Sequence, residues 1–181
     1  MEYRKLPKGE ERISVLGLGT SSIGMAGEKE IEAAMTAALE AGINFFDMAS
    51  ADAAPFPAYG KAIAGMREKL YFQIHFGADY HTGTYGWTTN LDAIKRSIDW
   101  QLTALGTDYI DFGFLHCIDE ESDLEQVLQS GILDYVQQLQ KDGTVRHIGL
   151  SSHTPLLVNK VLDMGVIDLL MFSINPAYDY Q

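Results

Sequence analysis

The sequence contains 181 residues, with 13 Lys and Arg against 25 Asp and Glu and a formal net charge of −12. Hydrophobic residues make up 46% of it, a share that is typical of chains with a packed core and excludes intrinsic disorder. The acidic balance excludes a nucleic-acid partner, because phosphate binding depends on clustered Lys and Arg. The single cysteine, Cys117, excludes an intramolecular disulfide framework and a metal site built from several thiolates.

The N-terminal stretch is polar, and the longest apolar runs, such as Leu169 to Phe172, are too short to cross a bilayer. We therefore expect no membrane partner. The lone cysteine fits a reducing compartment, so we expect a soluble, cytoplasmic protein.

Residues Met1 to Ser14 are expected to form a small hairpin that turns at Pro7, Lys8 and Gly9. Beyond it, short apolar runs alternate with longer amphipathic stretches. The short runs are nearly continuous in apolar residues, which predicts parallel strands buried on both faces. The predicted strands are Val15 to Gly19, Ile43 to Asp47, Leu70 to His75, Tyr109 to His116, Val145 to Leu150 and Ile167 to Phe172.

Amphipathic helices are predicted between these strands, and several carry capping signals at their ends. Helix starts are indicated by Thr89 with Asp92, by Ser122 with Glu125, and by Thr154 before Pro155; the glycines expected in left-handed backbone after helices are Gly42, Gly106, Gly143 and Gly165. The predicted helices are Glu28 to Ala41, Ala58 to Met66, Asn90 to Leu105, Asp123 to Lys141 with a break near Gly131, and Pro155 to Met164.

The strand starts recur about every 30 residues, which is the size of a βα repeat. A doubly wound nucleotide-binding sheet should follow its first strand with G-x-G-x-x-G, but Ser22 stands at the third glycine. We therefore predict an α/β fold of the (β/α)₈ TIM-barrel type that is incomplete, with six of eight βα units. Residues 1–181 are expected to form one partial barrel domain, comprising a hairpin at 1–14 and six βα units at 15–181.

Polar side chains close the apolar runs, at the strand ends where barrel enzymes place their chemistry. Each one alone could be a structural or capping residue, but their recurrence at the same topological position predicts a shared pocket. The residues are Thr20, Asp47, His75, His116, Ser151 with Ser152 and His153, and Asn175.

Several motifs in matching order resemble the aldo-keto reductase barrel. They are Gly17-Leu18-Gly19-Thr20, Gly42-Ile43-Asn44-Phe45-Phe46-Asp47, Leu105-Gly106-Thr107-Asp108-Tyr109-Ile110-Asp111, Leu115-His116 and Val145-Arg146-His147-Ile148-Gly149-Leu150-Ser151. The resemblance covers the chain from its first predicted strand to its sixth. The forms IHFGA, LSSHTP and MFSINPAYDY look most like a branch whose full-length members carry a C-terminal ferredoxin-like iron–sulfur segment.

The resemblance implies NADP(H)-dependent hydride transfer between carbonyl and alcohol, with catalytic Asp, Tyr, Lys and His. Asp47 and His116 match the family aspartate and histidine, whereas the lysine position holds His75 and the tyrosine position holds Asp52. Tyr59, which precedes a glycine as the family tyrosine does, aligns better with the following helix. The catalytic set is therefore altered. One substitute mechanism has His75 or His116 protonate the alkoxide, and the alternative is a pocket that has lost reductase chemistry.

The resemblance also implies residues that hold the cofactor, although the family's phosphate-gripping loops follow strands seven and eight. We therefore expect the full-length protein, not the 181-residue chain, to bind NADP(H) appreciably. A 4Fe–4S cluster is expected only in sequence beyond this chain. The expected cofactor-binding residues are Gly19, Thr20, Ser151, Ser152 and Asn175.

The segment from Phe76 to Thr88 is expected to be a long loop whose aromatic residues line a pocket for a small carbonyl substrate, or else pack over the barrel mouth. The expected substrate-pocket residues are Asp52, Tyr80, Tyr85 and Trp87.

Other functions remain open from the sequence. Asp47, His75 and His116 could converge on a divalent ion in a metal-dependent hydrolase, although we predict no metal site. A non-catalytic barrel or an electron-transfer module with a redox partner is a further alternative. The first and sixth strands would be open sheet edges, so we also expect self-association.

Overall fold

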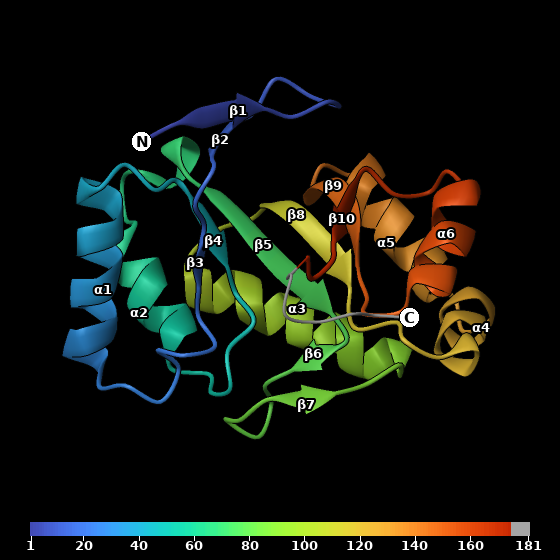
Figure 1. Cartoon of the computed structure of the whole chain (residues 1–181). Helices are drawn as coiled ribbons and strands as arrows, with labels where there is room; N and C mark the ends of the chain where they lie inside the picture. Colours follow the sequence, from blue (N-terminus) through green and yellow to red (C-terminus); the bar gives the residue numbers. More distant parts are fainter. Residues whose placement is uncertain (175–181) are drawn as a thin grey trace.

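The computed structural model describes residues 1–174. Its centre is a six-stranded parallel sheet in the order β10-β9-β8-β5-β4-β3, curled as an incomplete TIM-type barrel (Figure 1). The strands are β3 (Leu18–Gly19), β4 (Phe45–Asp47), β5 (Tyr71–Phe76), β8 (Ile110–Leu115), β9 (Val145–Ser151) and β10 (Leu169–Met171). The six predicted strands are thus present and parallel, and the predicted fold class is confirmed.

Helices flank the outside of the curled sheet (Figure 1). Their buried residues, such as Ile31, Ile98 and Val136, join outward-facing strand residues in the core. None of the helices among residues 1–174 has the combined length and apolar character that a bilayer-spanning helix needs. The helices are α1 (Glu28–Glu40), α2 (Pro55–Ala62), α3 (Leu91–Leu105), α4 (Glu121–Gln129), α5 (Ile132–Lys141) and α6 (Pro155–Asp163), with a 3₁₀ helix, η1 (Arg67–Lys69).

Two antiparallel hairpins lie at opposite ends of the sheet (Figure 1). The first pairs β1 (Tyr3–Lys5) with β2 (Arg12–Ser14), which confirms the hairpin expected at the N-terminus. The second pairs β6 (Ala78–Asp79) with β7 (Gly86–Trp87) beyond the carboxyl end of β5. The prediction of an irregular loop from Phe76 to Thr88 was therefore wrong, because this segment forms its own backbone pairing.

Several boundaries differ from the predictions for local reasons. Helix α2 begins at Pro55 rather than Ala58, since a proline is favoured in the first helical turn. The break predicted near Gly131 is confirmed, because α4 and α5 are separated there and the φ of Gly131, 80°, lies in the left-handed region. The cap of α3 is Asn90 rather than Thr89, and its side chain accepts a hydrogen bond from the Ala93 amide at 2.9 Å. The cap of α4 is Glu120 rather than Ser122.

A buried carboxylate fixes the central strands at their amino ends. Asp111 in β8 is fully buried and forms ion pairs of 2.9 Å with both Arg67 and Arg146. Its Oδ2 also accepts a hydrogen bond from the backbone amide of Phe72 in β5 at 2.9 Å. The carboxylate therefore links β8 to β5 and balances two guanidinium groups.

We expect Asp111→Asn to lower the free energy of unfolding by about 3 kcal/mol, because removal of one partner leaves buried charge without compensation. Asp163→Asn makes the same change of charge on an exposed position of α6 and should cost less than about 0.5 kcal/mol. Urea unfolding of the full chain measures both. Equal losses in the two variants would contradict a structural role for Asp111.

Candidate active site

Asp47 and His75 meet at the carboxyl ends of adjacent strands β4 and β5. The Oδ1 atom of Asp47 lies 2.7 Å from Nε2 of His75. Gln73, two residues before His75 on the same face of β5, donates to the same carboxylate oxygen at 3.1 Å. Because His75 is buried, its contact with Asp47 is sheltered from solvent.

His116 follows β8 and extends the group by one more imidazole. Its Nδ1 lies 3.0 Å from Nδ1 of His75, and its Nε2 lies 2.9 Å from the hydroxyl of Tyr85. Trp87 donates its indole N–H to the backbone oxygen of His116 at 3.1 Å. The β6–β7 hairpin thus supports His116 through two aromatic side chains.

The environment of His116 favours its neutral form. Burial, with a smaller contribution from the neighbouring His75, lowers the pKa of His116 from 6.5 to about 3. Burial raises the pKa of the Tyr85 hydroxyl, so this group keeps its proton near neutral pH. The His116 imidazole and the neighbouring Tyr85 hydroxyl are therefore both uncharged near neutral pH.

A cavity of about 210 Å³ opens beside these residues and is lined by His75, His116, Ser151 and Ser152, among others. Ligand sites usually measure about 300–1,000 Å³, so this cavity suits one ring-sized end of a dinucleotide rather than the whole molecule. Within residues 1–174, the contacts of the Ser151 hydroxyl are long ones to Cys117, at 3.4 Å to its amide and 3.8 Å to its sulfur. It can therefore turn toward an amide group, and the cavity fits the nicotinamide end of the expected cofactor.

The other expected cofactor residues have structural contacts or lie away from the cavity. The Ser152 hydroxyl donates to Asp119 at 3.1 Å and accepts the Thr154 amide at 3.1 Å. Thr20 is buried and donates to the backbone oxygen of Asp47 at 3.0 Å. Gly19 lies in the edge strand β3 with open space where a side chain would stand, and Asn175 lies outside the described residues.

The expected substrate-pocket residues occupy different environments. Asp52 accepts the Ala54 amide at 2.9 Å and forms a β-bridge with Thr84, so it shapes the turn before α2. Tyr80 is buried, and its hydroxyl bonds to the backbone nitrogen and oxygen of Ser50, both at 3.1 Å. Tyr85 and Trp87 are the two that contact His116 and remain partly exposed.

Tyr59 does not reach the site. It is fully buried in α2, and its ring packs edge-on against Phe46. Its hydroxyl finds no hydrogen-bond partner among residues 1–174, and burial raises its pKa. Sequence reasoning missed Gln73, although its two-residue spacing from His75 in a strand places both on one face.

The histidine and carboxylate positions do not surround a common point. The Nε2 atom of His75 contacts Asp47, and its Nδ1 atom contacts His116. These two nitrogens lie at different positions on the ring, so the two partners lie in different directions. This linear arrangement argues against the metal-hydrolase alternative.

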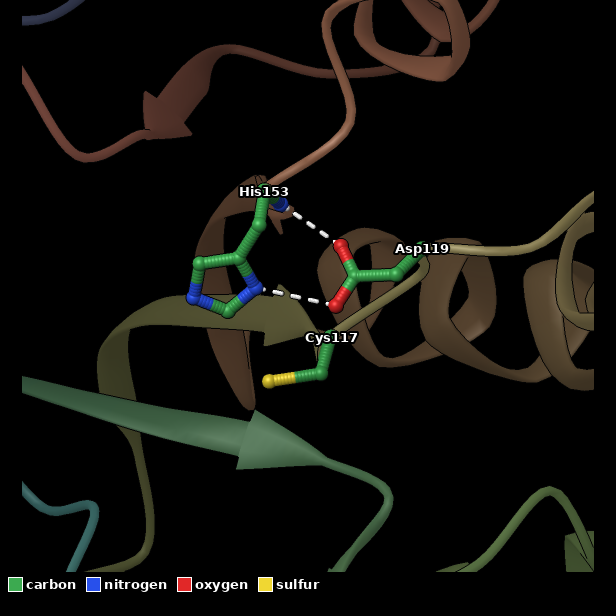
Figure 2. A group of neighbouring side chains, drawn as sticks. All are labelled: Cys117, Asp119 and His153. Carbon is green, nitrogen blue, oxygen red and sulfur yellow. Dashed lines mark hydrogen bonds and ion pairs between the residues drawn. The ribbon is translucent and has the colours of Figure 1, made fainter. Parts of the chain in front are cut away.

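Among the described residues, the ligand-type side chains that gather within 4.8 Å are instead Cys117, Asp119 and His153 (Figure 2). Both Asp119 oxygens already accept hydrogen bonds from His153, at 2.6 Å from its amide and 2.9 Å from Nδ1. Asp119 therefore has a structural role, because it holds the loop after β9 through His153.

A larger hollow of about 960 Å³ lies away from these residues, between α3 and α5. Its lining includes Arg67 and Tyr109, which stack on each other with the guanidinium carbon 4.0 Å from the ring centre. These aromatic and cationic side chains of the hollow already contact each other. We therefore place the candidate active site at the carboxyl ends of the strands and not in this hollow.

The lowered pKa of His116 predicts a pH dependence of stability. The unfolded chain takes up a proton below pH 6.5, whereas the folded chain does so only near pH 3. The stability due to neutral His116 is thus complete above pH 6.5 and is lost as the pH falls. Between pH 6.5 and 4.5 the wild type should lose about 2 kcal/mol more than His116→Gln. Urea unfolding at several pH values measures this, and identical slopes would contradict it.

Comparison with known proteins identifies the family of this chain. Residues 15–177 match the family model described as the aldo/keto reductase family. The uncharacterized oxidoreductase YqkF of Bacillus subtilis is 28% identical over 176 residues, covering 94% of this chain and 56% of that protein. Aldo-keto reductase yakc (NADP(+)) of Schizosaccharomyces pombe is 26% identical over 180 residues, covering 93% and 51%.

A solved structure of an aldo-keto reductase from Bacillus halodurans in its holo form matches with a TM-score of 0.79 and 27% identity. The match covers 96% of this chain and 58% of that one. The chain spans about half the length of the curated relatives that it matches. Since the family match extends across all six strands of the sheet, the chain belongs to the aldo/keto reductase family.

Proposed function

We propose that this protein is an NADP(H)-dependent oxidoreductase of small carbonyl compounds, with Asp47, His75 and His116 as its proton-handling centre. The observation that carries the proposal is the hydrogen-bonded contact of these three side chains at the carboxyl ends of β4, β5 and β8. Family membership and the NADP(+) in the name of the fission-yeast relative support the choice of cofactor.

When bound, the cofactor would supply a hydride to a carbonyl carbon. Ser151 would hold its nicotinamide end, because this hydroxyl faces the small cavity and has weak contacts. Asp47 would orient His75 through the 2.7 Å contact and balance a positive charge on it. Trp87 would fix the backbone of His116 through its carbonyl oxygen, and the contacts of the two ring nitrogens would hold the imidazole.

The catalytic set is altered relative to the family pattern that the sequence resembles. His75 replaces the lysine that lies beside the aspartate, and Asp52 occupies the tyrosine position. An imidazole beside a carboxylate can exchange a proton, so His75 would keep a proton-handling role at the lysine position. The proton donor must come from a residue other than Asp52, which is engaged in the turn before α2.

We expect the full-length gene product to consume NADPH in the presence of small aldehydes and ketones, at millimolar cofactor. His75→Gln should lower kcat by about 100-fold or more, because it removes the group that carries the proton. Loss of NADPH absorbance measures the rate, and Lys29→Gln on exposed α1 serves as the control. No consumption with any carbonyl compound would refute the proposal, as would full activity in His75→Gln.

We also propose that the chain associates with a second copy through the β10 edge. Within residues 1–174, β10 pairs with β9 alone, and Leu170 in this edge strand is 40% exposed. Leu170→Lys should weaken association, whereas Leu156→Lys, at a position 76% exposed on α6, should not. Size-exclusion chromatography with light scattering tests this, and a wild type that stays at 20.0 kDa at high concentration would contradict it.

The iron–sulfur branch, the electron-transfer alternative and the cytoplasmic location remain predictions. A run of cysteines encoded beyond Gln181 would establish the branch, because such clusters are held by cysteine thiolates.

A further inference from the structure

Four side chains from separate segments form one continuous hydrogen-bonded chain. It starts at Tyr85 beside β7, passes through His116 and His75, and ends at Asp47. The three contacts measure 2.9 Å from Tyr85 Oη to His116 Nε2, 3.0 Å between the two Nδ1 atoms, and 2.7 Å from His75 Nε2 to Asp47 Oδ1. Each histidine therefore uses both of its ring nitrogens within the chain.

The chemistry of the end groups fixes the direction of these bonds. An ionised carboxylate only accepts, so Nε2 of His75 carries a proton and donates to Asp47. In neutral His75, Nδ1 then accepts from Nδ1–H of His116, and Nε2 of His116 accepts from the Tyr85 hydroxyl. The network thus assigns a different tautomer to each histidine.

One added proton reverses two of the three bonds. With His75 as an imidazolium next to Asp47, its Nδ1–H donates to His116, and Nε2–H of His116 donates to Tyr85. The Tyr85 proton is then released from His116 and can point to another acceptor. His116 stays neutral in both arrangements, in agreement with the low pKa that its burial produces.

This geometry excludes both histidines as direct donors to a substrate, because neither has a ring N–H outside the chain. Tyr85 differs, since a hydroxyl can accept one hydrogen bond and donate another. It is also 41% exposed, whereas His75 and His116 are buried. The earlier expectation that a histidine protonates the alkoxide directly is therefore replaced by a donor at the end of the chain.

We propose, on the basis of the proposed reductase function, that Tyr85 is the catalytic proton donor and that His116 and His75 resupply its proton. After hydride addition turns the carbonyl oxygen into an alkoxide, the Oη–H bond of Tyr85 breaks and an O–H bond forms on the substrate. Oη takes the Nε2 proton of His116, and Nδ1 of His116 takes the Nδ1 proton of His75. One proton leaves the imidazolium, Tyr85 ends neutral, and His75 keeps the proton that it shares with Asp47.

Backbone pairing holds Tyr85 in place for this role. Its amide donates to the oxygen of Ala51 at 3.0 Å, and the Ala53 amide donates to Gly83 at 3.0 Å. The bridge between Asp52 and Thr84 lies between these two bonds. The loop after β4 therefore acts as a support for the hairpin that carries Tyr85.

The charge state of the relay depends on the groups around it. His75 faces Asp47 from β4, Gln73 within β5 and His116 from the end of β8. The titratable groups around His116 are His75, Asp47, Tyr85, Cys117, Asp119 and His153.

The first test is ¹⁵N NMR of the imidazoles in the full-length gene product, with Tyr85→Phe and, as a matched control, Tyr135→Phe on α5. At high pH, where the relay holds no added proton, we expect His75 as the Nε2–H tautomer and His116 as the Nδ1–H tautomer. Tyr85→Phe should shift the Nε2 resonance of His116, and Tyr135→Phe should not. An Nε2–H tautomer of His116 at high pH would overturn the relay.

The second test is kinetic and separates the relay from the proposed function. Tyr85→Phe should lower kcat by about 100-fold or more with little change in KM, and Tyr135→Phe should retain wild-type values. The double variant Tyr85→Phe with His75→Gln should lose no more than the worse single variant, because both act in one path. Carbonyl reduction that persists in Tyr85→Phe refutes the relay and leaves the function intact. A wild type without reductase activity refutes the function and with it the catalytic role of Tyr85.

Discussion

The parallel register of β4, β5 and β8 is the constraint on which the site depends. Asp47 lies opposite Gln73, and His75 lies opposite Phe114, so these side chains share the inner face of the curled sheet. A slip of one residue would turn a member of the relay toward the helix-covered face. The Asp111 carboxylate, bound to the Phe72 amide, opposes such a slip from the other end of the same strands.

Burial has different consequences at the two ends of these strands. At the amino end burial raises the pKa of Asp111, and two guanidinium groups, whose charges are permanent, act against this effect and pair with the carboxylate. At the carboxyl end Asp47 faces an imidazole, whose charge can change. Burial keeps His116 neutral, whereas the ring of His75 lies in contact with the Asp47 carboxylate. The same strands therefore combine a fixed ion cluster with a group that can exchange a proton.

The positions of Asp47, His75 and His116 could be predicted because they follow from local pattern and strand polarity alone. The identity of their partners could not. The hairpin of β6 and β7 has only two residues in each strand, and its placement depends on contacts with residues 51–53, far away in the sequence. Aromatic residues in such a segment look alike in sequence, yet Tyr80 packs with Phe56 and Trp100 in the core while Tyr85 reaches His116. Long-range packing gives Tyr80 and Tyr85 their different environments, and hydrophobic periodicity in the sequence does not encode such packing.

In the proposed relay, ring geometry would account together for the residues at the positions where the family resemblance implies lysine and tyrosine. A lysine is a flexible point charge, whereas an imidazole holds its two nitrogens on a rigid ring. Once Asp47 fixes Nε2 of His75, Nδ1 is directed at His116, whose own Nε2 is then directed at the β6–β7 hairpin. Asp52 lies outside this chain, and its loop pairs with the segment that carries Tyr85. In the proposed relay, His75 and Tyr85 belong to one hydrogen-bonded chain, and Asp52 lies in the loop that pairs with the segment carrying Tyr85.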